Sequence, residues 1–526
     1  MTDRMRTCLR LTLACVLVQL SVLHPLLHYH SDALAFSSGA EDLTPQDSSE
    51  KKQYLRATIE TLTLLGLVSA HYWATLIYEE DFDFDFSLET VGKKFTDEGI
   101  RFDDNDLSNN SFPGHPLAGA YYYLIARNYN LSRVESFLWS FTSSYLHEAF
   151  IEFPEVLSIN DMIATPFAGS TIGEAMYQLG KYLRCTKNRN TIANKIMSAV
   201  VDPIHLWHSI IWKDVDFISS EEEACYYATL QSDFNIFSGM STVLYESTGQ
   251  VKTGLILGGH GKLYLIPHYG EESDINRFFT DTVMVELALE INLTDEGIDN
   301  LTFYAKTIWA AYHRQQISKD PQGNVIGYSF LAGAASAFEH IQYDTGDFED
   351  TIGAVHLIGP AMELAFFQNS SYIRLGIDVF GDFAMVHPFA FPEYVENHTR
   401  DGIKSVLQKR NYYYAYGVTV NPKIEIRRDP YRFTTEYKYS YYDSFEGSDR
   451  RGRVPNDFNL VDEREEYRVT FGRLIDFINA KFFKKHQVWA EAEVRRRSRT
   501  GFIADDAVTH DASTTWFLMR IRINPF

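Results

Sequence analysis

Four ionisable residues in the first half of the chain are of the types that carry out acid–base chemistry. Each falls in a stretch with helical periodicity, so the packing of those helices could bring them to one polar pocket. An imidazole and several carboxylates held close together can transfer protons or ligate a metal ion. We therefore treat them as a candidate catalytic cluster, whose members are His115, Glu148, Asp161 and Glu174.

The same four residues also have a structural interpretation. A buried carboxylate is costly unless it is hydrogen-bonded, and a satisfied polar network fixes how helices pack. The chain contains neither the His-Glu-x-x-His motif of zinc proteases nor the Gly-x-Ser-x-Gly motif of serine hydrolases. The sequence favours the structural interpretation, and it assigns neither a metal ion nor a cofactor.

Residues 158–174, which read SINDMIATPFAGSTIGE, form a packing surface around two of these acids. On a helix, Thr165, Gly169 and Gly173 lie four residues apart and share one face. Such small residues let a second backbone approach closely, and Gly119 on an upstream helix offers a matching surface. The proline of this stretch removes one helical hydrogen bond, so we expect an irregularity there.

These residues belong to a helical region that extends from about Tyr54 to Trp212, where apolar residues recur at helical spacing. Residues 61–78 carry no Asp, Glu, Lys or Arg, which is borderline for a membrane span. Their Thr, Ser and His side chains favour a helix buried in a bundle. We predict a helical domain over 50–215, with helices at 114–128, 132–150 and 158–184.

After about residue 222 the apolar period changes to two. In residues 282–292, Val285 and Leu287 fall on one side of an extended chain, whereas Glu286 and Glu290 fall on the other. The same alternation recurs in residues 371–383, 411–420, 432–442 and 516–523. Strands of roughly 9–11 residues with this pattern are typical of transmembrane β-barrels, in which a closed ring of strands satisfies every backbone amide without water.

We therefore predict an α+β fold, in which an N-terminal helical bundle is followed over 222–526 by an antiparallel transmembrane β-barrel of about 12 strands. The alternative is a soluble β-sandwich or a lipocalin-like barrel, whose apolar side chains would point inward. Charge recurring on one side of the strands and tyrosine on the other favour the membrane barrel. The last strand ends in Phe526, which is similar to the terminal strand of bacterial outer-membrane proteins. Hairpin turns are predicted at 369–371, 421–423 and 427–430.

The N-terminal residues have the features of a secretory signal peptide. A segment with three arginines precedes a short apolar stretch, and Ala-Leu-Ala at 33–35 offers a cleavage site, so residues 1–35 are predicted to be removed.

The net charge of −22 argues against nucleic acid as a partner, because a phosphate backbone would be repelled. In an oxidising compartment Cys185 and Cys225 could form a disulfide; the alternative is two buried thiols.

A set of short motifs lies within one stretch of about 70 residues, in a core at 109–184. The motifs are His115-Pro116, Gly119, Tyr122-Tyr123, Ala126-Arg127, Ser158, Asn160-Asp161, Thr165-Pro166 and Gly173-Glu174. With these motifs the stretch resembles the bacterial domain-of-unknown-function family 3943, and it also looks faintly similar to VanZ-type membrane domains. The resemblance implies a helical architecture and an envelope context, and it implies no reaction.

Together these features predict an outer-membrane β-barrel protein of a Gram-negative envelope, with the helical domain in the periplasm or plugging the lumen. The expected partners are outer-membrane lipid and, during biogenesis, the barrel assembly machinery. The specific activity is left unassigned. The alternative function is a hydrolase-like envelope enzyme that acts on lipid or cell-wall material through the four-residue cluster. A third interpretation is a secreted, soluble α+β protein.

Overall fold

The computed structural model divides into two compact units, which meet in the sequence between Gly173 and Glu174. We call the first the helical unit and the second, which holds a thirteen-stranded sheet, the barrel unit. The predicted signal peptide and Cys225 lie outside the described residues. The structure describes residues 52–75, 92–96, 99–101, 114–152, 155–186, 191–212, 226–227, 229–344, 349–391, 393–394, 407, 411–445, 459–475, 487–503 and 508–524.

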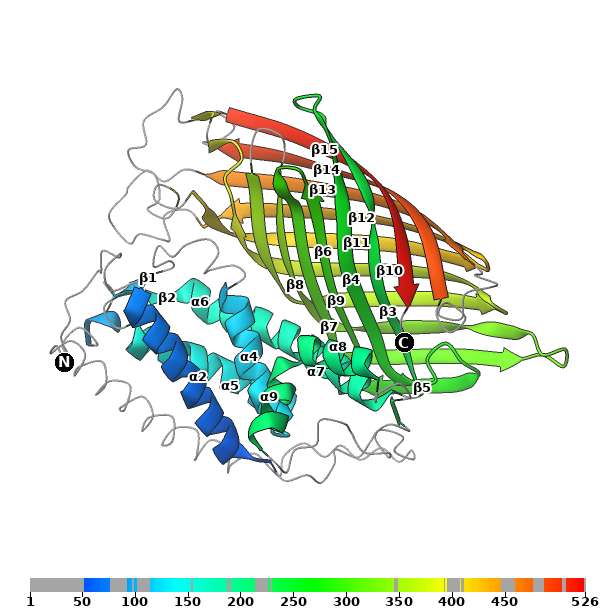
Figure 1. Cartoon of the computed structure of the whole chain (residues 1–526), viewed down its shortest axis with the longest axis horizontal. Coiled ribbons are helices and arrows are strands. Elements are labelled where there is room, and N and C mark those ends of the chain that lie inside the picture. Colours follow the sequence, from blue (N-terminus) through cyan, green and yellow to red (C-terminus); the bar gives the residue numbers. More distant parts are fainter. Residues whose placement is uncertain are drawn as a thin grey trace. The chain divides into compact units, whose positions relative to one another are not determined.

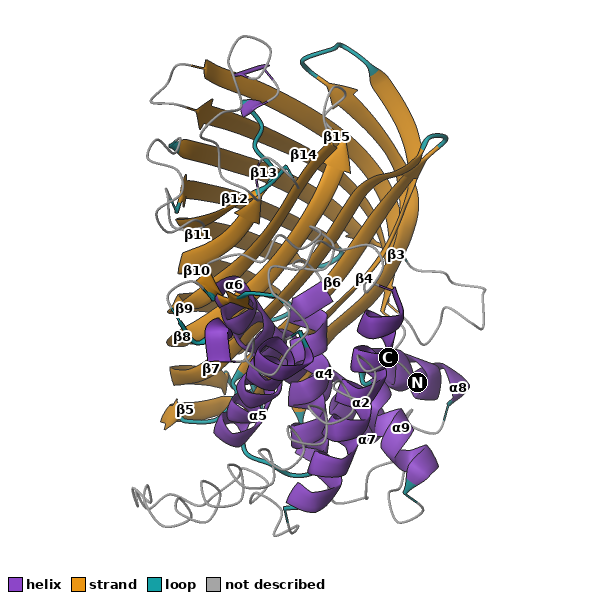
Figure 2. Ribbon diagram, turned by 90° about the vertical axis from the view of Figure 1, so that its left-hand side faces the viewer, coloured by secondary structure: helices purple, strands orange, loops and turns teal. Residues whose placement is uncertain are grey.

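The helices, which are purple in Figure 2, begin and end close to where the sequence predicts them. The second predicted helix ends in a π-helical turn, η3, and the third is formed by α6, the π-helical turn η4 and α7 in succession. Two short parallel strands, β1 (Ile100–Arg101) and β2 (Leu157–Ser158), accompany them. The bounds are α2 (Tyr54–Thr75), α4 (His115–Asn128), α5 (Arg133–Leu146), η3 (His147–Ile151), α6 (Ile159–Ile163), η4 (Ala164–Ala168), α7 (Gly169–Cys185), α8 (Ile192–Val201) and α9 (Pro203–Ile211).

The small-residue surface predicted in residues 158–174 is confirmed within the helical unit. A Cβ atom added to Gly119 would lie 1.8 Å from the carbonyl oxygen of Thr165, and one added to Gly169 would lie 2.5 Å from the backbone of Gly119. α4 therefore crosses η4 at backbone contact, a distance that only glycine permits. The expected irregularity is also present, because Pro166 lies in the π-helical turn η4.

The barrel unit contains a closed antiparallel barrel of twelve strands, as predicted (Figure 1). Segments β5 and β6 pair one after the other along β7, so together they act as one strand of the wall. The pairing of β15 with β3 and of β7 with β8 closes the ring. The bounds are β3 (Leu230–Tyr245), β4 (Val251–Pro267), β5 (Ser273–Phe279), β6 (Met284–Thr294), β7 (Gly297–Lys319), β8 (Val325–Asp344), β9 (Glu349–Gln368), β10 (Ser371–Val386), β11 (Tyr413–Arg428), β12 (Tyr431–Ser444), β13 (Leu460–Leu474), β14 (Gln487–Ile503) and β15 (Val508–Asn524).

The two ends of the barrel differ in their connections. β3 begins and β15 ends at the same end, which we call the terminal end; the other is the loop end. The terminal end has tight turns between β9 and β10 and between β11 and β12, which confirms the hairpins predicted there. The predicted turn at 421–423 is wrong, because Pro422 continues β11 in register with Ile377 of β10.

Side chains alternate between the two faces of the barrel wall, and the apolar ones point outward. Leu289 is exposed on the outer face of β6, whereas Glu286 and Glu290 on the same strand line the lumen. The predicted direction of the alternation is thereby confirmed. The outward and exposed apolar residues include Ile236, Met240, Leu255, Leu257, Leu289, Met362, Phe366, Ile373, Leu375, Val418, Ile424, Phe433, Val469, Phe471, Phe517, Met519 and Ile521.

No helix among the described residues is long and apolar enough to cross a membrane. This includes α2, which contains most of the uncharged stretch 61–78. The last part of α7, from Glu174 onward, belongs to the barrel unit together with α8 and α9.

The crossing of α4 and η4 predicts that Gly119→Ala lowers the free energy of unfolding of the helical unit by about 1–3 kcal/mol, because the new methyl group overlaps a backbone. The matched control is Gly66→Ala in α2, where an added Cβ meets nothing within 4 Å. There we expect a gain of about 0.5–1 kcal/mol from the better helix propensity of alanine. Urea titration followed by helical circular dichroism measures both, and equal stabilities would contradict the close crossing.

Candidate functional site

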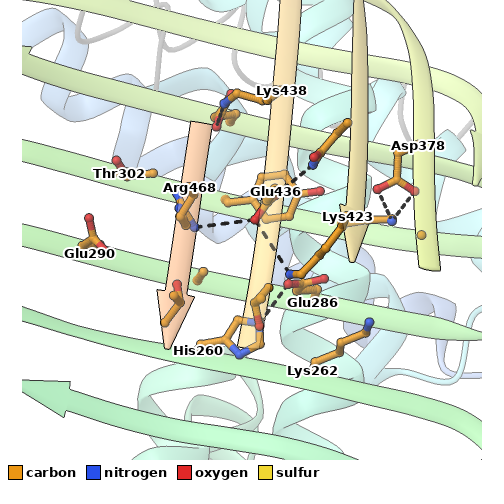
Figure 3. A pocket seen from close by; sticks show the side chains of 18 of the residues that line it. His260, Lys262, Glu286, Glu290, Thr302, Asp378, Lys423, Glu436, Lys438 and Arg468 are labelled. Atoms are coloured by element: carbon orange, nitrogen blue, oxygen red, sulfur yellow. Dashed lines mark hydrogen bonds and ion pairs between the residues drawn. The ribbon is translucent and has the colours of Figure 1, made fainter. Parts of the chain in front are cut away.

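The lumen of the barrel is the candidate functional site, because side chains of both charges converge on one cavity there. The cavity has a volume of about 260 Å³. In Figure 3, Glu436 lies between Arg468 and Lys423, at 3.9 Å and 3.8 Å. Nine carboxylates line the cavity: Glu286, Glu290, Glu339, Glu363, Asp378, Glu436, Glu466, Glu491 and Glu493. Eight cationic side chains face them: Lys262, Lys306, Lys423, Lys438, Arg432, Arg468, Arg520 and Arg522.

Several ion pairs cross the lumen and join strands that are not neighbours. Lys306 of β7 donates to Asp378 of β10 at 2.5 Å. Lys438 of β12 donates to Glu339 of β8 at 2.5 Å. A buried charge is stable only when it is paired, so each crossing pair fixes the distance between two walls. The lumen is consequently a narrow space bridged by side chains.

A row of arginines on β14 continues this network toward the loop end. Arg495, Arg497 and Arg499 are buried in the lumen and each meets a carboxylate. The guanidinium of Arg495 donates to Glu493 on its own strand at 2.7 Å and to Glu290 of β6 at 3.0 Å. Its planar group can hold two carboxylates at once, which lysine cannot do in the same geometry.

The cavity extends toward the terminal end of the barrel. A second cavity of about 270 Å³ shares His260, Lys262 and Glu363 with the first. It is also lined by Gln231 and Asn524, which lie where β3 begins and β15 ends. The polar lumen therefore reaches the terminal end.

The loop end is filled by apolar side chains instead. Phe391, Tyr394 and Leu407, from the connection between β10 and β11, belong to the same buried cluster as the lumen-facing Tyr343 and Tyr413. The cluster also contains lumen-facing residues of β3, β12, β13, β14 and β15. These close-packed apolar side chains occupy the lumen at this end, where the described residues place no charged cavity.

Three of the four predicted site residues lie in the helical unit, and two of them pair. Nε2 of His115 is 3.4 Å from Oδ1 of the buried Asp161. Glu148 is buried nearby and accepts a hydrogen bond from the backbone N–H of Ser158 at 3.3 Å. Lys94, which no sequence signal indicated, donates to the backbone carbonyl of Glu148. The structure thus brings three of the predicted residues into one polar region.

Burial and neighbouring acids shift the pKa values in this region in opposite directions. Burial, the charge of Glu152 and the charge of Asp161 raise the pKa of Glu148 well above its usual value. Burial would also raise the pKa of Glu152, but the charge of His147 at 3.0 Å and hydrogen bonds from His147 and Glu148 hold it at about 2. The surroundings therefore favour the neutral form of Glu148 and the ionised form of Glu152.

Glu174, the fourth predicted site residue, lies in the barrel unit. Its carboxylate accepts hydrogen bonds from Thr282 at 2.9 Å and from Gln178 at 2.7 Å. Cys185 is buried at the end of α7, and the disulfide with Cys225 stays a prediction. Among the described residues, no group of three or more His, Cys, Asp or Glu side chains is arranged to hold a metal ion.

Residues 99–204 match a known family. It is described as Domain of unknown function (DUF3943). The DUF3943 match contains α4, α5 and α7 and the three residues of the helical-unit cluster. No curated protein matches this chain.

The barrel is similar to solved structures of outer-membrane proteins. OccAB1 of Acinetobacter baumannii is 8% identical over 56% of this chain and 96% of its own, with a TM-score of 0.15. OmpT of Vibrio cholerae is 7% identical over 56% and 97%, and a FadL homologue of Pseudomonas aeruginosa is 6% identical over 57% and 91%; both have TM-scores of 0.20. Because these identities and TM-scores are low, we infer the function from the side chains of the barrel alone.

The arginine row predicts a large difference between two adjacent arginines. Arg495→Gln removes a buried guanidinium from Glu290 and Glu493, of which Glu493 keeps Arg520 at 2.9 Å, so we expect a loss of about 3 kcal/mol in the free energy of unfolding of the barrel. Arg496 pairs with Glu246 on the exposed outer side, and Arg496→Gln should cost at most about 1 kcal/mol. Unfolding by guanidinium chloride in detergent measures both losses of free energy, and losses of similar size would contradict the buried network.

The pKa of Glu148 predicts that the helical unit loses stability as pH rises. The pKa of Glu148 is higher in the folded than in the unfolded chain, so its protonation contributes to the free energy of unfolding. This contribution is fully present below the unfolded-state pKa of about 4.3, and it is lost as pH rises through the folded-state pKa. Glu148→Gln cannot ionise and should remove this loss. Glu152→Gln, at the acid with the lowered pKa, should instead reduce stability above about pH 4. Urea midpoints measured against pH test both, and parallel profiles for Glu148→Gln and the parent would contradict the assignment.

Proposed function

We propose that this chain is an outer-membrane β-barrel protein whose outer wall contacts acyl chains. The observation that carries the proposal is the polarity of the wall, with apolar side chains exposed outside and paired charges inside. In water this arrangement would be unfavourable, whereas in lipid it is the stable one. A lipocalin-like barrel would have the opposite polarity. Outer-membrane lipid and, during biogenesis, the barrel assembly machinery are the partners that this proposal requires.

The connectivity supports an orientation in the membrane. Twelve strands return the chain to the side from which it entered, so the DUF3943 segment precedes a barrel that begins and ends at one face. Outer-membrane barrels have short turns on the periplasmic side and longer loops outside. We therefore assign the terminal end to the periplasm and the loop end to the exterior, and we propose that the helical domain lies in the periplasm.

We further propose that the lumen is a chamber for small polar solutes. It reaches the terminal end and is closed by the apolar cluster at the loop end. Its nine carboxylates and eight cations nearly balance, which favours neutral polar or zwitterionic solutes over strongly charged ones. The crossing ion pairs restrict it to small molecules.

A second candidate function is an envelope enzyme that uses the helical-unit cluster. The raised pKa of Glu148 favours it, because a protonated carboxyl beside the His115–Asp161 pair could donate a proton to a substrate. Asp161→Asn should then abolish an envelope phenotype while the barrel still accumulates. If the variant simply fails to assemble, the cluster is structural.

The chamber proposal predicts that the protein conducts ions poorly in planar bilayers until the apolar cluster is weakened. Replacing Phe391 and Tyr394 by alanine should raise the conductance, because both come from the connection that fills the loop end. In that background Lys423→Glu should shift the reversal potential toward cation selectivity, since Lys423 lines both cavities. Arg496→Glu on the outer side is the matched control.

An unchanged conductance in the Phe391 and Tyr394 variant, with the barrel folded as judged by heat-modifiable migration on gels, would contradict the chamber. Recovery of the native chain in the aqueous periplasmic fraction would contradict the outer-membrane assignment itself.

A further inference from the structure

The end of α7 covers the outer wall of the barrel at its terminal end. Phe234, Leu263 and Val285 belong to one buried cluster with Leu179 and Leu183 of α7. Their alternation places Phe234, Leu263 and Val285 on the outward face, the same face as the exposed Ile236, Leu257 and Leu289 on those strands. α7 is therefore attached to the outside of β3, β4 and β6.

This attachment lies directly beside the apolar outer wall. Phe234 is covered by the α7 cluster, and the next outward residue on β3, Ile236, is 46% exposed. On β6, Leu287 packs against the cluster and the next outward residue, Leu289, is 42% exposed. Two residues along a strand correspond to about 7 Å, so the covered and the exposed parts of the wall are continuous.

α8 packs on the α7 cluster through polar side chains and through Met197 and Val201. The side-chain amide of Asn194 donates to Thr186 at 2.8 Å, and Arg184 of α7 donates to Asp202 at 3.0 Å. Asn194 and Ser198 are only 2% and 1% exposed. The polar groups between α7 and α8 are thus buried and paired.

One row of apolar residues on each of α8 and α9 points away from the protein. Ile192, Ile196 and Val200, spaced four residues apart on α8, are 77%, 57% and 67% exposed. On α9 the polar His208 is 1% exposed, whereas Ile210 is 66% exposed. Trp207 and Ile211 are exposed as well. A helix in water buries its apolar stripe, so these two helices have the polarity of the barrel wall, and not that of a soluble surface.

We infer that α8 and α9 form a hairpin embedded in the acyl chains of the leaflet next to the terminal end. This inference rests on the proposed outer-membrane location. Lipid is the occupant that fits, because α7 is buried between the apolar outer wall and α8, and the surfaces on both sides of it are apolar and exposed. With ten and nine residues, the helices are about 15 Å long, half the thickness of the hydrocarbon layer, so they lie within one leaflet. The hairpin adds a lipid-binding surface to the barrel.

Spin-label accessibility tests the hairpin in the full chain, reconstituted in phosphatidylethanolamine–phosphatidylglycerol vesicles with its four native cysteines replaced by serine. Labels at Ile196→Cys and Ile210→Cys should show a several-fold higher ratio of oxygen to nickel-chelate accessibility than a label at Gln322→Cys, which lies in an exposed turn. They should match a label at Met240→Cys, which is 70% exposed on the outer wall. Heat-modifiable migration on gels confirms that each variant is folded.

Three results would overturn the inference. If the nickel chelate reaches the labels at 196 and 210 while the label at Met240→Cys lies in lipid, the hairpin is in water and the proposed function still holds. Labels at 196 and 210 that neither reagent reaches would show that a second copy or another protein covers the hairpin. A nickel-accessible label at Met240→Cys would overturn the outer-membrane location, and the hairpin with it.

Discussion

The closure of the ring of strands is the constraint on which the structure of the barrel depends. β3 pairs with β15 and β7 pairs with β8, so the sheet closes on itself, and among the described strands of this sheet β5 alone has a single partner, β7. A backbone amide without a partner costs several kcal/mol in lipid, and closure is what allows an outer wall of apolar side chains. Closure also has a consequence for the inside. Because side chains alternate, each strand sends half of its residues into the lumen, where polar groups need partners of their own.

The ion pairs of the lumen meet that need and also determine what the lumen can do. A pair such as Lys306–Asp378 stabilises both charges and bridges two walls, so the lumen is narrow where it is polar and closed where it is apolar. The same inverted polarity recurs in α8, where Asn194 is buried and Ile192 is exposed. The proposed apolar surround accounts for the polarity of both the strands and α8.

The alternation of residues was sufficient to predict the closed barrel, its approximate strand number and the outward side of strands such as β6. The glycine spacing likewise predicted the close crossing at Gly119. Three features could not be read from the sequence. Arg495 meets Glu290 because of the register of the closed ring, and the two are 205 residues apart. The closure of the loop end depends on how a long connection folds back. Glu174 shares a helix with the predicted cluster, yet its carboxylate binds Thr282 of the barrel unit.

The central claim is that the exposed apolar wall of the folded chain is covered by acyl chains. The amount of detergent bound to the purified, heat-modifiable chain measures this most directly, by sedimentation or by light scattering combined with refractive index. We predict that the folded protein carries a full belt of detergent around the barrel and aggregates when the detergent is removed. A folded, monodisperse chain that binds no detergent would contradict the account.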